Sequence, residues 1–255
     1  MLNNDSNGHT FKKRVVFTTG GKGGVGKTGV TLAIADWYQS RQIPFLPLDL
    51  DTENKALGSL RHYFPQAQKV NIHTDAGLDI FLSILADGQA DIILADMGGG
   101  AGLVTYQWFQ FMKDDFSQLG ISFTAVGVIT PDPASVESVL TWASNLEDRV
   151  QYLIVENSNT SNPDFTYWHQ TKQAQAFRST FNPLVIPMEF RLPELERIAR
   201  QYGVTLRTIG TRSTPVATQL QIAHIIRAQR YTQRFAAQLD AAENFLLPSS
   251  VSQTL

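Results

Sequence analysis

The chain has 255 residues, of which 43% are hydrophobic and 17% charged, and its formal net charge is −2. This composition is typical of a globular protein with a substantial core, and the polar N-terminus and the lack of a long apolar run exclude a secretory signal and a membrane-spanning helix, so we expect a cytoplasmic protein. The chain has no cysteine, which excludes disulfides, thiolate zinc sites, iron–sulfur clusters and thiol catalysis.

Short apolar segments alternate with helical patterns along the chain. Strands are expected at residues 14–19, 43–50, 91–96, 121–130, 151–157 and 183–187. Helices are expected at residues 28–40, 55–64, 78–87, 103–119, 134–146 and 192–202. This alternation predicts α/β architecture, a single doubly wound domain with a mostly parallel central sheet flanked by helices. We expect the domain at 14–247, between a disordered N-terminal tail (1–13) and a flexible C-terminal tail (248–255).

The first strand and helix are separated by a glycine-rich loop. Residues 21–28 read GKGGVGKT and fit G-x-x-x-x-G-K-[ST], the phosphate-binding loop of P-loop NTPases. The backbone N–H groups of such a loop cradle phosphates, the lysine neutralises the β- and γ-phosphates, and the hydroxyl binds Mg²⁺. We therefore expect ATP and Mg²⁺ as cofactors. The expected contacts are Gly21, Lys22, Gly23, Gly24, Val25, Gly26, Lys27, Thr28 and Gly29, with Thr28 also a metal ligand.

A second lysine in the loop, Lys22, is not required by that motif. With it the stretch reads KGGVGKT, which resembles the deviant Walker A signature of the ParA/MinD superfamily. The resemblance implies that two ATP-bound subunits pair face to face and that Lys22 of each reaches the nucleotide of the other. A cation supplied by the partner would make hydrolysis depend on dimer formation. Lys22 and Lys27 are thus expected to act in catalysis.

Two carboxylates, Asp49 and Asp51, follow the second expected strand. Strand alternation would aim both toward the ligand if the strand extends that far. The resemblance implies that they belong to switch I, with Asp49 near magnesium through water and Asp51 orienting the attacking water. A turn or helix cap is the alternative at this position.

The third expected strand ends in DMGGG, residues 96–100. The resemblance implies that Asp96 is the Walker B type acid of the magnesium site. A backbone N–H of Gly98 or Gly99 would then sense the γ-phosphate as part of switch II, and the sequence leaves open which glycine does so. A capped glycine turn is the alternative.

Two later strand ends are expected to surround the base. The resemblance, which extends from Arg14 to about Leu206, implies that Asn157 lies on the adenine edge and that Pro187 lines the base. Asparagine at a strand end is also a common turn residue, so a purely structural role for Asn157 stays open.

Positive charge is concentrated in residues 172–240, which hold ten Lys or Arg against four Asp or Glu. Thr214 and Pro215 predict the start of a long C-terminal helix toward Leu247. On this helix three arginines fall within ~60° of one another, opposite an apolar face. These are Arg227, Arg230 and Arg234, against Ile225, Ala228, Phe235 and Leu239. The stripe is expected to bind DNA phosphates without reading bases, and a merely solvated face is the alternative.

Several relatives are excluded by what the sequence lacks. Iron–sulfur and metalloid branches depend on cysteine, and MinD-like members end in a basic amphipathic helix, whereas this chain has no cation after Arg234. With thirteen residues before the first strand, we expect no additional N-terminal helix-turn-helix domain. The histidines are scattered and none forms an H-x-x-x-H pair, which argues against a structural metal site, and FTYWHQ at 165–170 is expected to pack under a loop.

The combined expectation is a slow, magnesium-dependent ATPase that forms a homodimer with ATP and is stimulated by a partner protein. It would position or partition a cargo, plasmid DNA or a protein complex, over the nucleoid, without a membrane. The alternative is a regulatory ATPase of a conjugation or secretion machine that acts without DNA. A metabolic P-loop enzyme is a third class, against which Lys22 argues.

Overall fold

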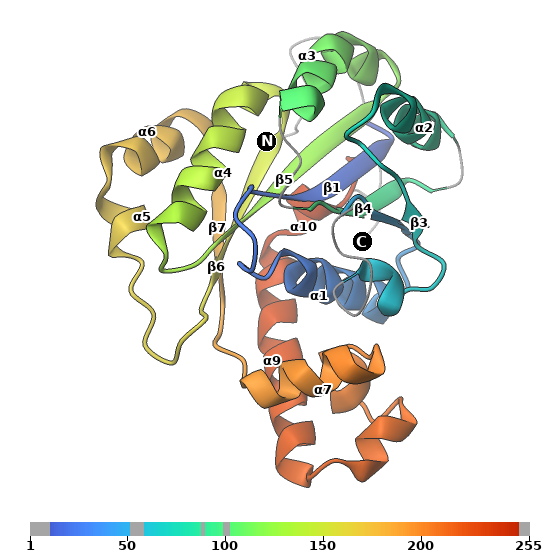
Figure 1. Ribbon diagram of the computed structural model, residues 1–255, viewed down its shortest axis with the longest axis vertical. Helices are drawn as coiled ribbons and strands as arrows, with labels where there is room; N and C mark the ends of the chain where they lie inside the picture. Colours follow the sequence, from blue (N-terminus) through green and yellow to red (C-terminus); the bar gives the residue numbers. More distant parts are fainter. Residues whose placement is uncertain (1–10, 52–58, 88–89, 99–102, 250–255) are drawn as a thin grey trace.

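The computed structural model describes residues 11–51, 59–87, 90–98 and 103–249 (Figure 1). Within these residues, seven strands form one sheet in the order β3-β2-β4-β1-β5-β6-β7, and all paired strands are parallel. The strands are β1 (Lys13–Thr19), β2 (Leu46–Asp49), β3 (Gln68–Lys69), β4 (Ile92–Asp96), β5 (Ile121–Ile129), β6 (Gln151–Asn157) and β7 (Leu184–Met188). The predicted doubly wound parallel sheet is confirmed.

Helices cover both faces of this sheet, as the apolar, β-branched strands require. They are α1 (Lys27–Ser40), α2 (Asp75–Ala86), α3 (Leu103–Gln118), α4 (Pro133–Leu146), α5 (Thr166–Gln170), α6 (Lys172–Phe181), α7 (Pro193–Tyr202), α8 (Leu206–Gly210), α9 (Ile222–Ala241) and α10 (Glu243–Leu246). Three 3-10 turns lie in the described ranges, η1 (Leu60–His62), η2 (Glu147–Arg149) and η3 (Pro215–Gln219). Helices α1, α9 and α10 pack on one face, and α2 to α6 on the other (Figure 1).

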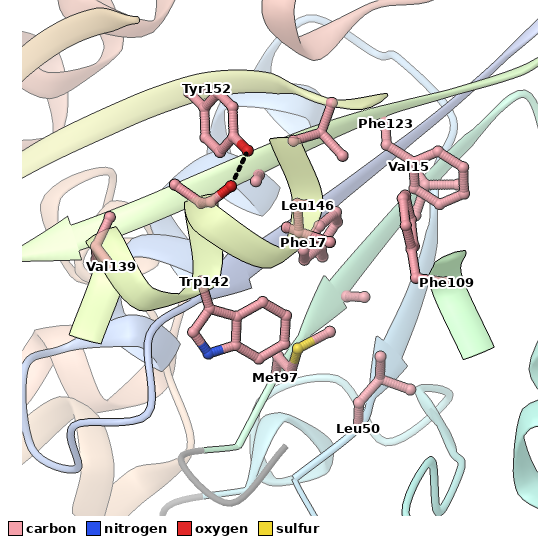
Figure 2. Packing of buried hydrophobic residues seen from close by; sticks show 14 of the residues in the cluster. Val15, Phe17, Leu50, Met97, Phe109, Phe123, Val139, Trp142, Leu146 and Tyr152 are labelled. Carbon is pink, nitrogen blue, oxygen red and sulfur yellow. Dashed lines mark hydrogen bonds between the residues drawn. The ribbon is translucent and has the colours of Figure 1, made fainter. Parts of the chain in front are cut away.

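The core beneath α2 to α6 is rich in aromatic side chains (Figure 2). Phe17 of β1 lies edge-on to Phe123 of β5, with ring centroids 6.3 Å apart, and 6.5 Å from Trp142 of α4. The Tyr152 hydroxyl donates to the Ala143 carbonyl over 3.3 Å. Met97, directly after β4, is buried in the same cluster. Interlocked side chains of this kind hold the strand ends in place, and the strand ends carry the site.

A protrusion made of α7, α8, η3 and the first half of α9 extends beyond the sheet (Figure 1). It has a small core of its own, with Ile198, Ala199, Ile209 and Ala228 buried. Helix α1 is joined to it by a hydrogen bond of 2.8 Å from the Thr205 hydroxyl to the Asp36 carboxylate.

The C-terminal helix begins later than expected. Thr214 and Pro215 start the 3-10 turn η3 instead, and the long helix begins at Ile222 after Gln221. Val216 and Leu220 pack against the small core of the protrusion, and an extended Leu220 breaks the helical path. The local capping signal was correct for a turn, but tertiary packing decides how far the helix extends.

Other boundaries also differ. The strand expected at 43–50 is confined to Leu46–Asp49, consistent with Pro44, which has no backbone N–H to pair. The helix expected at 55–64 lies partly outside the described residues, and only the turn η1 is found at its end. Strand β3 and helices α5 and α6 were not predicted from the sequence. Trp168 of α5 is buried in the core, so the expected packing of the aromatic cluster is confirmed.

Candidate functional site

The glycine-rich loop joins β1 to α1 and forms one wall of a cavity of about 1150 Å³. Gly24 and Gly26 have φ angles of +76° and +95°, a region that side-chain-bearing residues rarely adopt. Gly26 is the N-cap of α1 and provides no side-chain cap. The N–H groups in the first turn of α1 therefore have no side-chain acceptor at the N-cap, which is the usual arrangement of a phosphate site.

The two loop lysines lie in different surroundings. Lys27 is buried, and its ammonium donates to the Lys22 carbonyl over 2.9 Å. Lys22 is exposed, and its ammonium is 3.3 Å from the Asp132 carboxylate, in the loop before α4. Lys22 is not among the described residues that line the cavity. Ser138 of α4 accepts the backbone N–H groups of Gly21 and Lys22, and so holds the start of the loop.

Asp96, at the end of β4, is buried and surrounded by hydroxyl groups. Thr28 donates to one carboxylate oxygen over 2.7 Å. Thr31 and Thr18 donate to the other over 3.0 and 3.2 Å. Burial raises the pKa of the Asp96 carboxyl to about 6, although these hydrogen bonds lower it. The predicted pair of Thr28 and Asp96 is thus brought together, with oxygen ligands of the kind that Mg²⁺ prefers.

Asp49 and Asp51 occupy different positions. Asp49 is the last residue of β2, is fully buried, and accepts the Asp51 N–H over 3.1 Å. Asp51 lies beyond the strand, so the alternation that was expected to aim both side chains alike does not extend to it. It nevertheless lines the cavity. A Cβ on Gly98 would lie 2.7 Å from an Asp51 carboxylate oxygen, so this close contact requires glycine. Gly99 lies outside the described residues.

The two residues expected at the base, Asn157 and Pro187, both line the cavity. Asn157 is buried, and its side-chain N–H donates to the Val25 carbonyl over 2.8 Å. Its amide oxygen is buried and has no hydrogen-bond partner among the described residues. Pro187 of β7 lines the same cavity. Asn157 therefore supports the phosphate loop and also presents an unsatisfied acceptor, which fits a ligand with an N–H donor.

A basic residue that the sequence analysis did not single out, Arg191, also lines the cavity. Its guanidinium would lie 3.4 Å from a Cβ placed on Gly29, in the first turn of α1. Its Nε donates to Glu196 over 2.6 Å. Nothing in the local pattern marks Arg191 or Ser138, because both reach the loop only through the folding of distant segments. The sequence marks Asp132 only as a helix cap, in the stretch PDPAS at residues 131–135, and the structure confirms it as the N-cap of α4.

The three arginines of α9 are exposed and lie together, as predicted, and the opposite face of the helix is buried. They line a second hollow of about 530 Å³ together with the loop after β6. Arg234 is partly engaged, because its Nη1 donates to both carboxylate oxygens of Glu189 at 2.9 Å. Five residues line both this hollow and the cavity at the glycine-rich loop: Ser158, Glu189, Phe190, Tyr231 and Arg234. The stripe is thus one wall of a hollow beside the first site.

No helix in the described ranges is long and apolar enough to cross a membrane. In the same part of the chain, no three His, Cys, Asp or Glu side chains are grouped so as to hold a metal.

Comparison with known proteins gives a family and several structures with modest similarity. The model of the CobQ/CobB/MinD/ParA nucleotide binding domain matches residues 16–245. A nucleotide-binding protein from Archaeoglobus fulgidus, in complex with ADP, is similar with a TM-score of 0.44 and 20% identity, over 76% of this chain and 87% of that one. The MinC:MinD cell division protein complex of Aquifex aeolicus is similar with a TM-score of 0.45 and 18% identity, over 85% of this chain and 95% of that one. No curated protein sequence matches significantly.

The family match covers most of the chain, from β1 to α10, and includes the phosphate loop and both acidic strand ends. The geometry agrees, since the loop, Thr28 and Asp96 converge at the carboxyl ends of neighbouring parallel strands. The chain therefore belongs to the CobQ/CobB/MinD/ParA nucleotide binding domain family.

Proposed function

We propose that the protein is a magnesium-dependent ATPase that forms a homodimer when it binds ATP. The observation that carries this proposal is the position of Lys22. Its ammonium is exposed, pairs with Asp132 and does not line the cavity of its own chain, whereas Lys27 does. A cation placed on the rim of the loop can act on the nucleotide of a second subunit, where it would stabilise charge that develops on the γ-phosphate.

Within one subunit, the described residues can hold a nucleoside triphosphate. The first turn of α1 provides N–H groups for phosphate oxygens, and Lys27 provides the charge. Thr28 and Asp96 would hold Mg²⁺, which bridges phosphate oxygens and neutralises their charge. Asn157 and Pro187 would meet the base, and the support for this is that both line the cavity and that the Asn157 amide oxygen has no partner among the described residues, which suits the amino group of adenine.

Asp51 is the residue proposed to orient the attacking water. It lines the cavity, and its carboxylate lies so near Gly98 that a Cβ built there would be 2.7 Å from it, which supports this role. Hydrolysis would be slow in a monomer, because Lys22 of the partner is then missing. A further protein that stabilises the closed dimer would stimulate it.

The cellular role that we propose is positioning or partitioning of a cargo, plasmid DNA or a protein complex, through nonspecific DNA binding of the ATP-bound dimer. Its support is the exposed face of Arg227, Arg230 and Arg234. Cations of this kind bind phosphates without sequence preference, and two subunits would present two such faces at once. The protein would then act on the nucleoid.

A second role is favoured by the ion pair of Arg234 with Glu189. It leaves Arg227 and Arg230 as the arginines of the hollow that have no ion pair in the described part of the chain. Two arginines per subunit make few phosphate contacts, and binding with few contacts is weak at physiological salt. A regulatory ATPase of a conjugation or secretion machine, acting without DNA, would fit this arrangement.

Size-exclusion chromatography tests the dimer. Asp51→Ala should bind ATP and accumulate as a dimer, because hydrolysis is blocked, and the same variant with ADP should stay monomeric. Adding Lys22→Ala to Asp51→Ala should abolish the ATP dimer while ATP affinity in dilute protein stays unchanged. An ATP dimer that survives Lys22→Ala, together with wild-type turnover in the single variant, would contradict the proposal.

A DNA retention assay separates the two roles. The ATP-bound Asp51→Ala dimer should shift nonspecific duplex DNA, and changing Arg227, Arg230 and Arg234 to alanine should abolish the shift without loss of the dimer. The slope of log Kd against log salt should fall by about one unit for each phosphate contact removed. If the wild-type arginines give no shift at low salt, the role without DNA is supported instead.

A further inference from the structure

A row of polar residues crosses three neighbouring strands at their carboxyl ends. Asp49 of β2 is paired in register with Lys69 of β3 on one side and with Asp96 of β4 on the other. Partner residues in a parallel sheet direct their side chains to the same face. Two buried carboxylates and a lysine therefore lie side by side across these strands, and Lys69 is part of this row because the short strand β3 places it there.

Asp49 has its polar contacts inside the chain. One carboxylate oxygen accepts the Asp51 N–H over 3.1 Å. The other accepts the Ser59 hydroxyl and is 4.0 Å from the Lys69 ammonium. A fully buried carboxylate needs such partners, since burial without them is costly. Both oxygens of Asp49 are thus engaged by protein groups, and Asp49 does not line the cavity within the described residues.

Two of the residues that Asp49 binds, Asp51 and Ser59, come directly before and after residues 52–58 in the sequence. Ser59, on the far side, accepts the Arg61 N–H at the start of η1, and Leu60 of that turn is buried in the core. Ser59 is therefore a fixed point on the body of the protein. Asp51, on the near side, is held through its N–H by Asp49, and its carboxylate lies so near Gly98 that a Cβ there would be 2.7 Å from it. Asp49 connects the fixed point to the residue proposed to orient water.

We propose that Asp49 is a positioning residue for Asp51, with Ser59 and Lys69 as its supports, and not a ligand of the metal. Lys69 supplies the positive charge that lets Asp49 lie beside Asp96. Ser59 fixes the orientation of the Asp49 carboxylate, and that carboxylate fixes the backbone of Asp51. The inference rests on the proposed hydrolysis for its kinetic consequence, but the contact that it assigns can be measured without turnover.

Steady-state kinetics of Ser59→Ala and Lys69→Met test the inference. Each should lower kcat about tenfold, the effect of losing one hydrogen bond to a charged group, while KM and the affinity for a fluorescent ATP analogue stay within about twofold. The Mg²⁺ concentration at half-maximal rate should not change. Lys69→Arg should restore most of the rate because it restores the charge. Ser83→Ala and Lys172→Met are matched controls, remote from the site and exposed, and should behave as wild type.

Hydrogen exchange of the Asp51 amide is the second measurement. In nucleotide-free protein, Ser59→Ala and Asp49→Ala should speed its exchange, because Asp49→Ala removes the acceptor of the Asp51 N–H, and Lys69→Arg should not. Wild-type turnover by Ser59→Ala and Lys69→Met would overturn the inference and leave the proposed function intact. So would an Asp49→Asn variant whose rate recovers at high Mg²⁺, because that result identifies a metal ligand. A wild-type protein that binds ATP but never hydrolyses it would contradict the proposed function, and the exchange data would still decide whether Asp49 holds Asp51.

Discussion

The phosphate end of the cavity and the arginine face of α9 are built in opposite ways. At the phosphate end, Lys27, Thr28 and Asp96 are enclosed by the sheet and by hydroxyl groups. On the arginine face, Arg227 and Arg230 are exposed and Arg234 is engaged by Glu189. Burial makes each interaction strong and specific, whereas exposed charges are screened and individually weak. We therefore expect large effects of substitutions at the first region and graded effects at the second.

The largest effect is expected for Lys27→Ala. If Lys27 binds phosphates as proposed, removing this buried cation should weaken ATP binding by roughly a hundredfold or more. Isothermal titration calorimetry with dilute protein would measure this, and Lys22→Ala is the matched control because Lys22 lies outside the cavity of its own chain. Equal losses for the two lysines would mean that both act within one subunit.

The hydrogen bond between Thr205 and Asp36, which connects the protrusion to α1, should make the stability of the protein depend on pH. Burial raises the pKa of the Asp36 carboxyl to about 7, above its ordinary value, although the hydrogen bond from Thr205 lowers it. A raised pKa contributes stability at low pH that is lost as pH rises through 7. In the wild-type protein, this group should therefore lower the unfolding free energy by about 2 kcal/mol between pH 5 and pH 8. Asp36→Asn should lack this part of the decrease.

Urea unfolding of both proteins at the two pH values would measure this difference. Exposed Asp79→Asn serves as the control. The same pH dependence in wild type and Asp36→Asn would show that Asp36 does not titrate in this range.

Gly26→Ala probes the shape of the phosphate loop. A methyl group at this position would lie 2.5 Å from the Asn157 side-chain nitrogen, on a backbone with φ +95°. We expect a loss of about 1–2 kcal/mol in unfolding free energy without nucleotide. Gly23→Ala, where the added carbon meets nothing within 4 Å, should be close to neutral. Combining Gly26→Ala with Asn157→Ala should recover the part of the loss caused by the clash.

The smallest effect is expected on the arginine face. Glu189→Gln releases Arg234 for phosphate and should tighten DNA binding of the ATP dimer by about two- to fivefold at low salt, in line with the small strength of exposed ion pairs. Fluorescence anisotropy at several salt concentrations would measure this. In an Arg234→Ala background the gain should disappear. A gain that persists there would instead reflect a general reduction in negative charge.

Sequence patterns predicted the phosphate end well because its geometry is mostly local. The spacing within residues 21–28 brings the lysine and the hydroxyl to one loop, and the apolar strand before Asp96 indicates where its carboxylate must lie. The parallel sheet followed from the alternation of strands and helices. The apolar face of α9 and its arginine stripe followed from helical periodicity, because 3.6 residues per turn holds whatever packs against the helix.

Contacts between distant segments could not be predicted in this way. Ser138 and Arg191 reach the loop from α4 and from the segment after β7, and Lys69 reaches Asp49 through a strand of two residues. Glu189 binds Arg234 across 45 positions of the chain. No local spacing encodes such pairs, because they depend on the order of strands in the sheet and on where each loop returns.

By itself, the sequence determined the type of fold, the phosphate loop and the residues that can meet a triphosphate, since short-range periodicity and spacing specify them. Only the tertiary structure decided that α9 begins at Ile222, that Asp49 points into the protein toward Ser59, and that Lys22 lies outside its own cavity. The physical reason is that burial and register are properties of the packed sheet. They place a side chain in the site or away from it regardless of the motif that contains it.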